Sequence, residues 1–136
     1  MSEVGNQQLV IVSIKQRYPG HARQAAILTC QNRPAAYHGR YVIVVDDDID
    51  PSDVQNVLWA LCTRSDPEKD IEIFRRAWST PLDTMIRKPT DAYFNSRAII
   101  DACKPYEWIE EFPKDIKISS DLAEKVQRKW GTLLNL

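Results

Sequence analysis

The sequence predicts a single α/β domain in three layers, with a mainly parallel sheet of about four strands between flanking helices. Three observations lead to this fold class. The 136 residues are enough for one hydrophobic core and leave no room for a second. Short apolar segments alternate with segments of helical periodicity, which is the order of parallel βαβ units. The two clearest strand segments are apolar nearly throughout, as is typical of strands buried on both faces.

The first half of the chain contains two predicted strands and the helix between them. Gln8–Ile14 is the first strand, and Pro19-Gly20 interrupts the chain after it. His21–Cys30 carries alanines at helical spacing, and their small side chains allow close packing on a sheet. Arg40–Asp46 is rich in β-branched residues and is the predicted second strand.

The second half is predicted to complete the sheet and its second layer of helices. A helix begins at Ser52 or Asp53, both good N-cap residues, and its apolar stripe continues to Leu61. Ile71–Phe74 and Ala98–Ala102 are the predicted third and fourth strands, separated by an irregular segment. The strand order along the chain therefore favours right-handed crossovers within one sheet.

The two ends of the chain are predicted to differ. Residues 1–7 are a flexible polar lead-in, and residues 8–136 form the domain. A last helix begins at Ser119 or Ser120 and ends at Gly131. Its apolar stripe is Leu122, Val126 and Trp130.

Composition and charge exclude several classes of function. Lys and Arg number 18 and Asp and Glu 19, so the net charge is −1, which argues against nucleic acid or an anionic membrane as a partner. The longest apolar runs are too short for a transmembrane segment, and no secretory leader opens the sequence, so we expect a cytoplasmic protein. The three cysteines lie far apart and predict buried, reduced thiols without a metal site. They are Cys30, Cys62 and Cys103.

Four tryptophans are the other compositional feature. They are Trp59, Trp78, Trp108 and Trp130. Without a basic groove they do not indicate a stacking surface for single-stranded nucleic acid. We expect them in the core and in an interface with another protein.

The acidic run Asp46–Asp50 follows the predicted second strand, at the edge where open α/β sheets place ligands. A calcium loop is excluded, because Pro51 stands where the turn glycine belongs and Val57 where the bidentate glutamate belongs. Receiver domains have a similar acidic run and a late Lys-Pro, here Lys104-Pro105, but the spacing does not match. The third interpretation is structural: the carboxylates cap the next helix and pair with Arg64 or Lys69.

Basic residues gather at the end of the first predicted strand. Lys15, Arg17, His21 and Arg23 surround Gly20 at the start of a helix. The first amides of a helix have no internal partners, so this arrangement fits an anion site. A hydrated surface patch is the equal alternative, and a lone histidine gives no argument for catalysis.

Taken together, several segments in the same order resemble the C-terminal domain of the UbiD family, the prenylated-flavin-dependent decarboxylases of aromatic and α,β-unsaturated acids. The segments are Val12–Ala22, Tyr41–Pro51, Asp53–Pro67 with Asp70, Ser79–Asp83 and Ser96–Ala102, with Leu122–Leu134 similar to the closing helix. Asn95-Ser96-Arg97 stands where the family often has a Gly-Ser-Lys type segment, so we expect a loop of different shape there.

The resemblance implies that the cofactor and the catalytic residues belong to a flavin-binding region and not to this chain. In the family that region carries prenylated FMN, a divalent metal, potassium, and the catalytic Arg and Glu residues, and it precedes this domain. None of it is in this sequence, so we expect no catalytic residue here and no activity of this chain alone. The expected substrate of the complete enzyme is an aromatic or unsaturated carboxylic acid.

The resemblance also implies roles for particular residues. Thr80-Pro81-Leu82 matches the stretch that faces the substrate, and Leu9 lines the same pocket. Lys15, Arg17 and His21 match a recurrent motif that serves an anion, an interdomain contact or structure. We expect a homo-oligomer that contains the flavin-binding domain or subunit. The alternative function is a non-catalytic assembly or regulatory module of the same fold.

Overall fold

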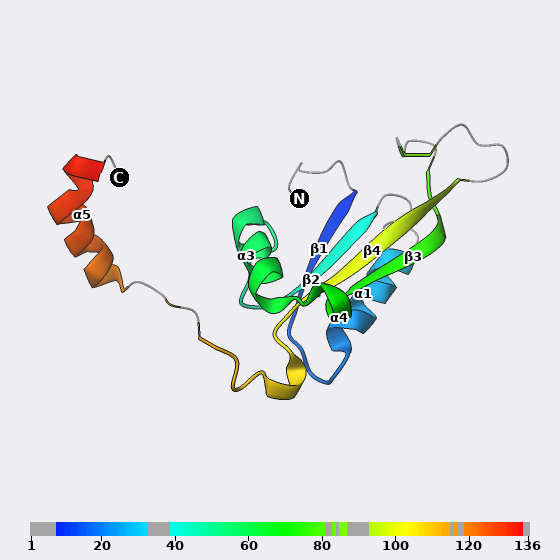
Figure 1. The fold of residues 1–136 in the computed structure, drawn as a ribbon, viewed down its shortest axis with the longest axis horizontal. Helices are drawn as coiled ribbons and strands as arrows, with labels where there is room; N and C mark the ends of the chain where they lie inside the picture. Colours follow the sequence, from blue (N-terminus) through cyan, green and yellow to red (C-terminus); the bar gives the residue numbers. More distant parts are fainter. Residues whose placement is uncertain are drawn as a thin grey trace.

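The computed structural model describes residues 8–32, 39–80, 83, 85–86, 93–114, 116 and 119–134. Within this part, one four-stranded sheet has the order β1-β2-β4-β3 (Figure 1). The strands are β1 (Leu9–Ile14), β2 (Tyr41–Asp46), β3 (Ile71–Trp78) and β4 (Phe94–Ala102). β1, β2 and β4 are parallel, and β3 runs antiparallel to β4. The predicted fold class is confirmed.

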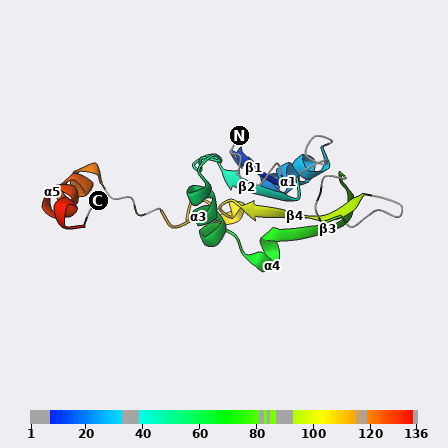
Figure 2. The ribbon, with the colours of Figure 1, turned by 90° about the horizontal axis from the view of Figure 1, so that it is seen from above.

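Helices lie on both sides of this sheet, which makes three layers (Figure 2). The helices are α1 (His21–Gln31), α3 (Val54–Arg64), α4 (Pro67–Asp70) and α5 (Ser120–Leu134), with a 3-10 turn η1 (Tyr106–Trp108). α1 begins after Gly20, whose φ of 79° is left-handed and suits a residue without Cβ. α3 begins after Asp53, whose side chain accepts hydrogen bonds from the amides of Gln55 and Asn56.

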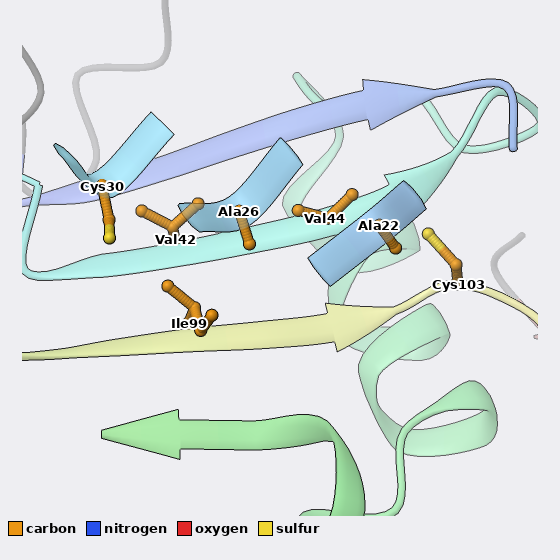
Figure 3. Close-up of a cluster of buried hydrophobic side chains, with 7 residues drawn as sticks. All are labelled: Ala22, Ala26, Cys30, Val42, Val44, Ile99 and Cys103. Carbon is orange, nitrogen blue, oxygen red and sulfur yellow. The ribbon is translucent and has the colours of Figure 1, made fainter. Parts of the chain in front are cut away.

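The core consists of two apolar clusters, one on each face of the sheet. Small residues of α1 lie directly on β2 and β4 (Figure 3). Members of this cluster are Ala22, Ala26, Cys30, Val42, Val44, Ile99 and Cys103. On the other face, Val57 and Ala60 of α3 contact a cluster that contains Ile43, Val45 and Ala102. The middle strand β2 is buried on both faces, which explains its apolar sequence.

The structure corrects several local expectations. The third and fourth strands are longer than predicted, because antiparallel pairing between β3 and β4 extends beyond the apolar segments. Pro67–Asp70, in a polar stretch with no predicted element, is the short helix α4. Cys62 is exposed rather than buried. All four tryptophans are between 40% and 47% exposed, so none belongs to the core.

The last helix differs from the others because it lies apart from the sheet in both views (Figures 1 and 2). It continues past Gly131 to Leu134, since one glycine costs an exposed helix only about 1 kcal/mol. Every residue from Ser120 to Trp130 is exposed, including the predicted apolar stripe. None of the described helices has the length and apolar content needed to cross a bilayer.

The close contact of α1 with the sheet predicts a strong effect of side-chain size. Ala26 is 1% exposed within the α1 cluster. We expect Ala26→Leu to lower the free energy of unfolding by about 1–3 kcal/mol, because the added atoms have no space. Gln24→Leu, at an exposed position of α1, should change it by less than about 0.5 kcal/mol. Urea unfolding measures both, and equal effects would contradict this account of the core.

Candidate functional site

Asp46 connects three segments at the carboxyl end of the sheet. It is the last residue of β2 and is 5% exposed. Its Oδ1 accepts a hydrogen bond of 2.8 Å from Gln16, which follows β1. Its Oδ2 accepts from the Lys104 amide, which follows β4, at 2.7 Å and from Arg64 of α3 at 3.1 Å. One carboxylate therefore joins the exits of β1 and β4 to the end of α3.

Asp48 adds a second carboxylate to the same cluster. The buried guanidinium of Arg64 donates to both of its oxygens, at 2.8 and 3.0 Å, and the Lys104 Nζ donates to Oδ2 at 2.6 Å. Hydrogen bonds and charge from these two cations, against the opposing effect of burial, lower the pKa of Asp48 to about 2. The negative charges of Asp46 and Asp48 are thus compensated by Arg64 and Lys104 of the same chain.

The structural interpretation of the acidic run is confirmed in part. Arg64 is the predicted cation, whereas Lys69 pairs with Asp66 instead. Lys104 was not predicted as a partner, because it is distant in sequence and only parallel pairing brings β4 beside β2. Asp53, and not the acidic run itself, caps α3. Within the described residues, no group of three or more His, Cys, Asp or Glu is placed to hold a metal ion.

A cavity of about 230 Å³ opens beside this cluster, between the start of α1 and the segment after β4. Arg23, Asp101, Lys104 and Tyr106 are among its lining residues. Burial raises the pKa of Asp101, whose carboxylate accepts a hydrogen bond from the Cys103 amide. Arg23 is paired with Glu72, so the positive charge on this side is largely compensated.

Of the predicted basic residues at this end, Arg23 lines the cavity, whereas Lys15, Arg17 and His21 do not. Lys15 and Arg17 are exposed, and the His21 ring stacks on Tyr18 with 4.5 Å between ring centroids. None of the three is among the described lining residues. Their role as an anion or interdomain contact stays a prediction.

A buried polar network lies at the opposite end of the sheet. The Asp83 side chain is fully buried and forms an ion pair with Arg40. Asn95 donates to it at 2.9 Å and the Met85 amide at 2.9 Å. Burial favours the neutral acid, but these hydrogen bonds and the Arg40 charge keep the pKa of Asp83 below its ordinary value. Asp83 is therefore held as a carboxylate inside the fold.

This network fixes the segment that begins after β3. The hydroxyl of Ser79 lies 3.4 Å from Asp83, and the Ser79 amide donates to the Tyr93 carbonyl at 2.8 Å. Thr80 is 0% exposed. Beneath the segment, buried Arg97 donates to the Trp78 carbonyl at 2.5 Å and to the Cys30 carbonyl at 3.0 Å. Asn95-Ser96-Arg97 is part of β4, so the expectation of a loop there was wrong.

Arg40 connects this segment to the start of β1. Its amide donates to the Gln8 carbonyl at 2.9 Å, and its carbonyl accepts from Ala98. Leu9 pairs with Tyr41 on the neighbouring strand. Two predicted substrate-side residues, Leu9 and Thr80, thus lie at one end of the sheet, on opposite edges. Pro81 and Leu82 lie outside the described residues.

Sequence reasoning missed the side chains that hold this end together. Arg40 was predicted as part of a strand, and Asp83 and Arg97 were noted only within segments of resemblance. One signal was available in the sequence: these charged residues stand in segments that were otherwise expected to be buried. Since a buried charge requires a partner, each of them indicated an ion pair or a hydrogen bond. Their partners could not be identified without the sheet order.

The geometry defines an α/β domain with the strand order β1-β2-β4-β3. At each end of its sheet, a buried carboxylate forms an ion pair with a cation of the same chain. Residues 1–102 match the family described as the 3-octaprenyl-4-hydroxybenzoate carboxy-lyase C-terminal domain, UbiD_C. The match covers well over half of the chain, so the chain belongs to the UbiD family and contains its C-terminal domain.

Solved structures agree with this assignment. The open form of vanillic acid decarboxylase from Sedimentibacter hydroxybenzoicus is 30% identical with a TM-score of 0.67, and the match covers 93% of this chain and 26% of that one. The UbiD-class enzyme HmfF from Pelotomaculum thermopropionicum, solved in complex with FMN, is 26% identical with a TM-score of 0.70, covering 84% and 24%.

A further structure shares the fold at lower identity. The 3,4-dihydroxybenzoic acid decarboxylase from Enterobacter cloacae is 21% identical with a TM-score of 0.68, covering 88% of this chain and 26% of that one. This chain therefore spans about a quarter of the length of the enzyme chains that it matches.

The cation cluster around Asp48 predicts a dependence of stability on pH. Because the pKa of Asp48 is about 2, below its ordinary value near 3.9, its ionised form stabilises the fold above about pH 4. That contribution is lost as the pH falls from about 4 toward 2. We expect Asp48→Asn to lower the free energy of unfolding at pH 7 by about 1–2 kcal/mol, allowing for solvent screening.

The difference between the wild type and Asp48→Asn should shrink as the pH falls through this range. Thermal unfolding between pH 7 and pH 3 measures it. Asp47→Asn is the matched control, since Asp47 is the exposed neighbour in the same run. A difference that stays constant down to pH 3 would contradict the assigned ion pairs.

Proposed function

We propose that this chain is the C-terminal domain or small subunit of a UbiD-type prenylated-flavin-dependent (de)carboxylase, in which it closes the substrate pocket and contributes to assembly. The observation that carries the proposal is the buried Arg40–Asp83 network. It holds Ser79 and Thr80 at the same end of the sheet as Leu9. This arrangement suits a rigid wall for a substrate, rather than a set of reacting groups.

The proposal places the flavin and its metal outside the described residues. They include no cluster of donors for a metal ion, and the acidic run is occupied by Arg64 and Lys104. Prenylated FMN, the divalent metal and potassium therefore belong to a flavin-binding domain or subunit in this proposal. We assign no step of the reaction to this chain through them.

The proposed reaction is loss of CO2 from an aromatic or α,β-unsaturated carboxylic acid, with the catalytic groups outside this chain. The residues of this chain would orient the acid and exclude water when the two domains close. Thr80, Pro81, Leu82 and Leu9 are the proposed pocket residues, and apolar side chains among them suit an aromatic or alkenyl group. Lys15, Arg17 and His21 lie at the far end of the sheet and are proposed for an interdomain or anion contact.

Leu82→Arg tests the pocket assignment. The variant is introduced in the source cell, the protein is isolated with its native flavin-binding region, and CO2 release is measured over a panel of such acids. We expect at least a tenfold loss, because an unpaired guanidinium beside an apolar substrate is poorly solvated. Leu82→Met is the matched control and should retain most of the activity.

Two results would contradict the proposal. One is equal CO2 release by Leu82→Arg and Leu82→Met, with thermal unfolding unchanged. The other is a native preparation without a flavin-binding region and without CO2 release, which would support the non-catalytic assembly or regulatory module.

Self-association is part of the proposal and is supported by α5. Its stripe of Leu122, Val126 and Trp130 is exposed. An isolated helix of 15 residues is only marginally stable in water, so we expect this stripe to pack against another surface. A groove of about 710 Å³ between α3 and the segment after η1 is lined by Trp59, Phe112 and other residues. We propose that α5 of one copy lies in this groove of another, as in an exchanged arm.

Val126→Glu tests this arrangement. A carboxylate in the middle of the stripe would be buried without a partner, so we expect the native mass to fall toward that of the monomer. Light scattering after size exclusion measures it. Lys125→Glu changes the neighbouring polar position and should leave the mass unchanged. An unchanged mass in Val126→Glu would contradict a role for α5 in assembly.

A further inference from the structure

Among the described residues, α3 covers one face of the sheet only at one end. α3 lies at the end where β2 and β4 finish, whereas α1 lies along the other face (Figure 2). Ile43, Val45 and Ile100 form the cluster beneath α3. Alternate residues of a strand share a face, so Tyr41 and Phe94 lie on this same face, at the end away from α3. This half of the face is called the open face below.

The open face is apolar and aromatic. Ile73 pairs with Ala98 and Trp78 with Phe94, which places both on it. Ile73 is 66% exposed, and Tyr41, Trp78 and Phe94 are each between 42% and 47% exposed. Leu9 and Ile11 of β1 extend the surface to the opposite edge. Exposed apolar surface of this extent across adjacent strands is typical of an interface.

A β-bulge places cations at the rim of the open face. The β3–β4 register shifts between Phe74 and Ala77, and Arg76 has a φ of 57°. Such a conformation is unfavourable for a residue with a Cβ, and bulges commonly redirect side chains at functional surfaces. The Arg76 guanidinium lies 4.9 Å from the Phe94 ring centroid. In the described part of the chain, no carboxylate forms an ion pair with Arg75 or Arg76.

The matched enzymes indicate what covers this face. About three quarters of each of those chains lies outside the match, and the matched family is a C-terminal domain, so the rest of such a chain precedes β1. β1 begins with Leu9, at the end of the sheet where the open face lies. A larger body that precedes β1, as in the matched enzymes, would thus join this domain at the end of the sheet where the open face lies.

We infer that the open face is the docking surface for the flavin-binding region, whose complementary surface is apolar with anionic groups opposite Arg75 and Arg76. This inference rests on the proposed function. α5 is the other candidate occupant within this chain, and it is proposed above for the groove beside α3. The same contact would place Leu9 and the segment containing Thr80 at the boundary between the two bodies.

Site-specific photocrosslinking in the source cell tests the surface directly. p-Benzoylphenylalanine replaces Tyr41 or Trp78 on the open face, and Leu28 or Trp130 elsewhere as controls. After irradiation of the native complex, the joined peptides are identified by mass spectrometry. Crosslinks from Tyr41 and Trp78 to peptides of the flavin-binding region are the expected result.

The remaining outcomes of the crosslinking overturn the inference. Crosslinks from Tyr41 and Trp78 to α5 or to a second copy of this domain would assign the face to assembly instead. No crosslink at these positions, while a control position reacts, would show that the face is uncovered. If the native preparation holds no flavin-binding region, the proposed function fails as well, whereas crosslinks elsewhere in a flavin-containing complex overturn this inference alone.

Ile73→Glu provides a second test with a closely matched control. Ile73 is 66% exposed and Leu28, on the outer side of α1, is 65% exposed, so neither substitution should unfold the domain. We expect Ile73→Glu to reduce CO2 release by the native complex at least tenfold, and Leu28→Glu to reduce it less than twofold. Similar effects of both substitutions, or no effect of either, would overturn the inference.

Discussion

The bond network of Asp46 is the interaction on which the rest of this fold depends. Its two oxygens bind the segment after β1, the segment after β4 and the last turn of α3. Three parallel strands and the helix on one face therefore end at a single buried carboxylate. Removing one partner of such a buried pair typically costs about 3–5 kcal/mol, since the remaining charge is left unsolvated. The acidic run resembles a ligand site in sequence, but its first carboxylate holds the ends of β1, β4 and α3 together.

At the other end of the sheet, a second buried carboxylate also connects separate segments. Asp83 and Arg40 join the segment after β3 to the carbonyl of Gln8 before β1, across strands that are not adjacent. In both places the charged groups are paired within the chain. The buried ion pairs of the described chain therefore hold backbone segments together, and the open face offers a partner an apolar surface with Arg75 and Arg76 at its rim.

The sequence was sufficient for the parts of the fold that depend on local patterns. Apolar β-branched segments predicted β1 and β2, and the spacing of alanines predicted α1. The N-cap residue and the apolar stripe that follows it predicted α3. The antiparallel direction of β3 was not predictable, because strand direction depends on a connection whose path has no periodic signal. The partners Lys104 and Arg40 were missed for a related reason: each becomes a neighbour of its carboxylate only through the sheet order. Exposure of all four tryptophans was equally inaccessible, since aromatic residues occur in cores and in interfaces alike.

The distribution of exposed aromatic surface bears on why such a domain occurs within a larger enzyme. Trp78 and Phe94 lie beside the Asp83 network, and Trp130 lies on α5, at opposite extremes of the described chain (Figure 1). A domain that acts alone gains nothing from two separate exposed apolar surfaces, because each of them favours association. In the proposed function the open face meets a flavin-binding region and α5 meets a second copy, so that both surfaces are buried in the complete enzyme. Pocket closure and assembly would then draw on the same rigid sheet, so that a change at either end alters the position of the substrate-facing segment between them.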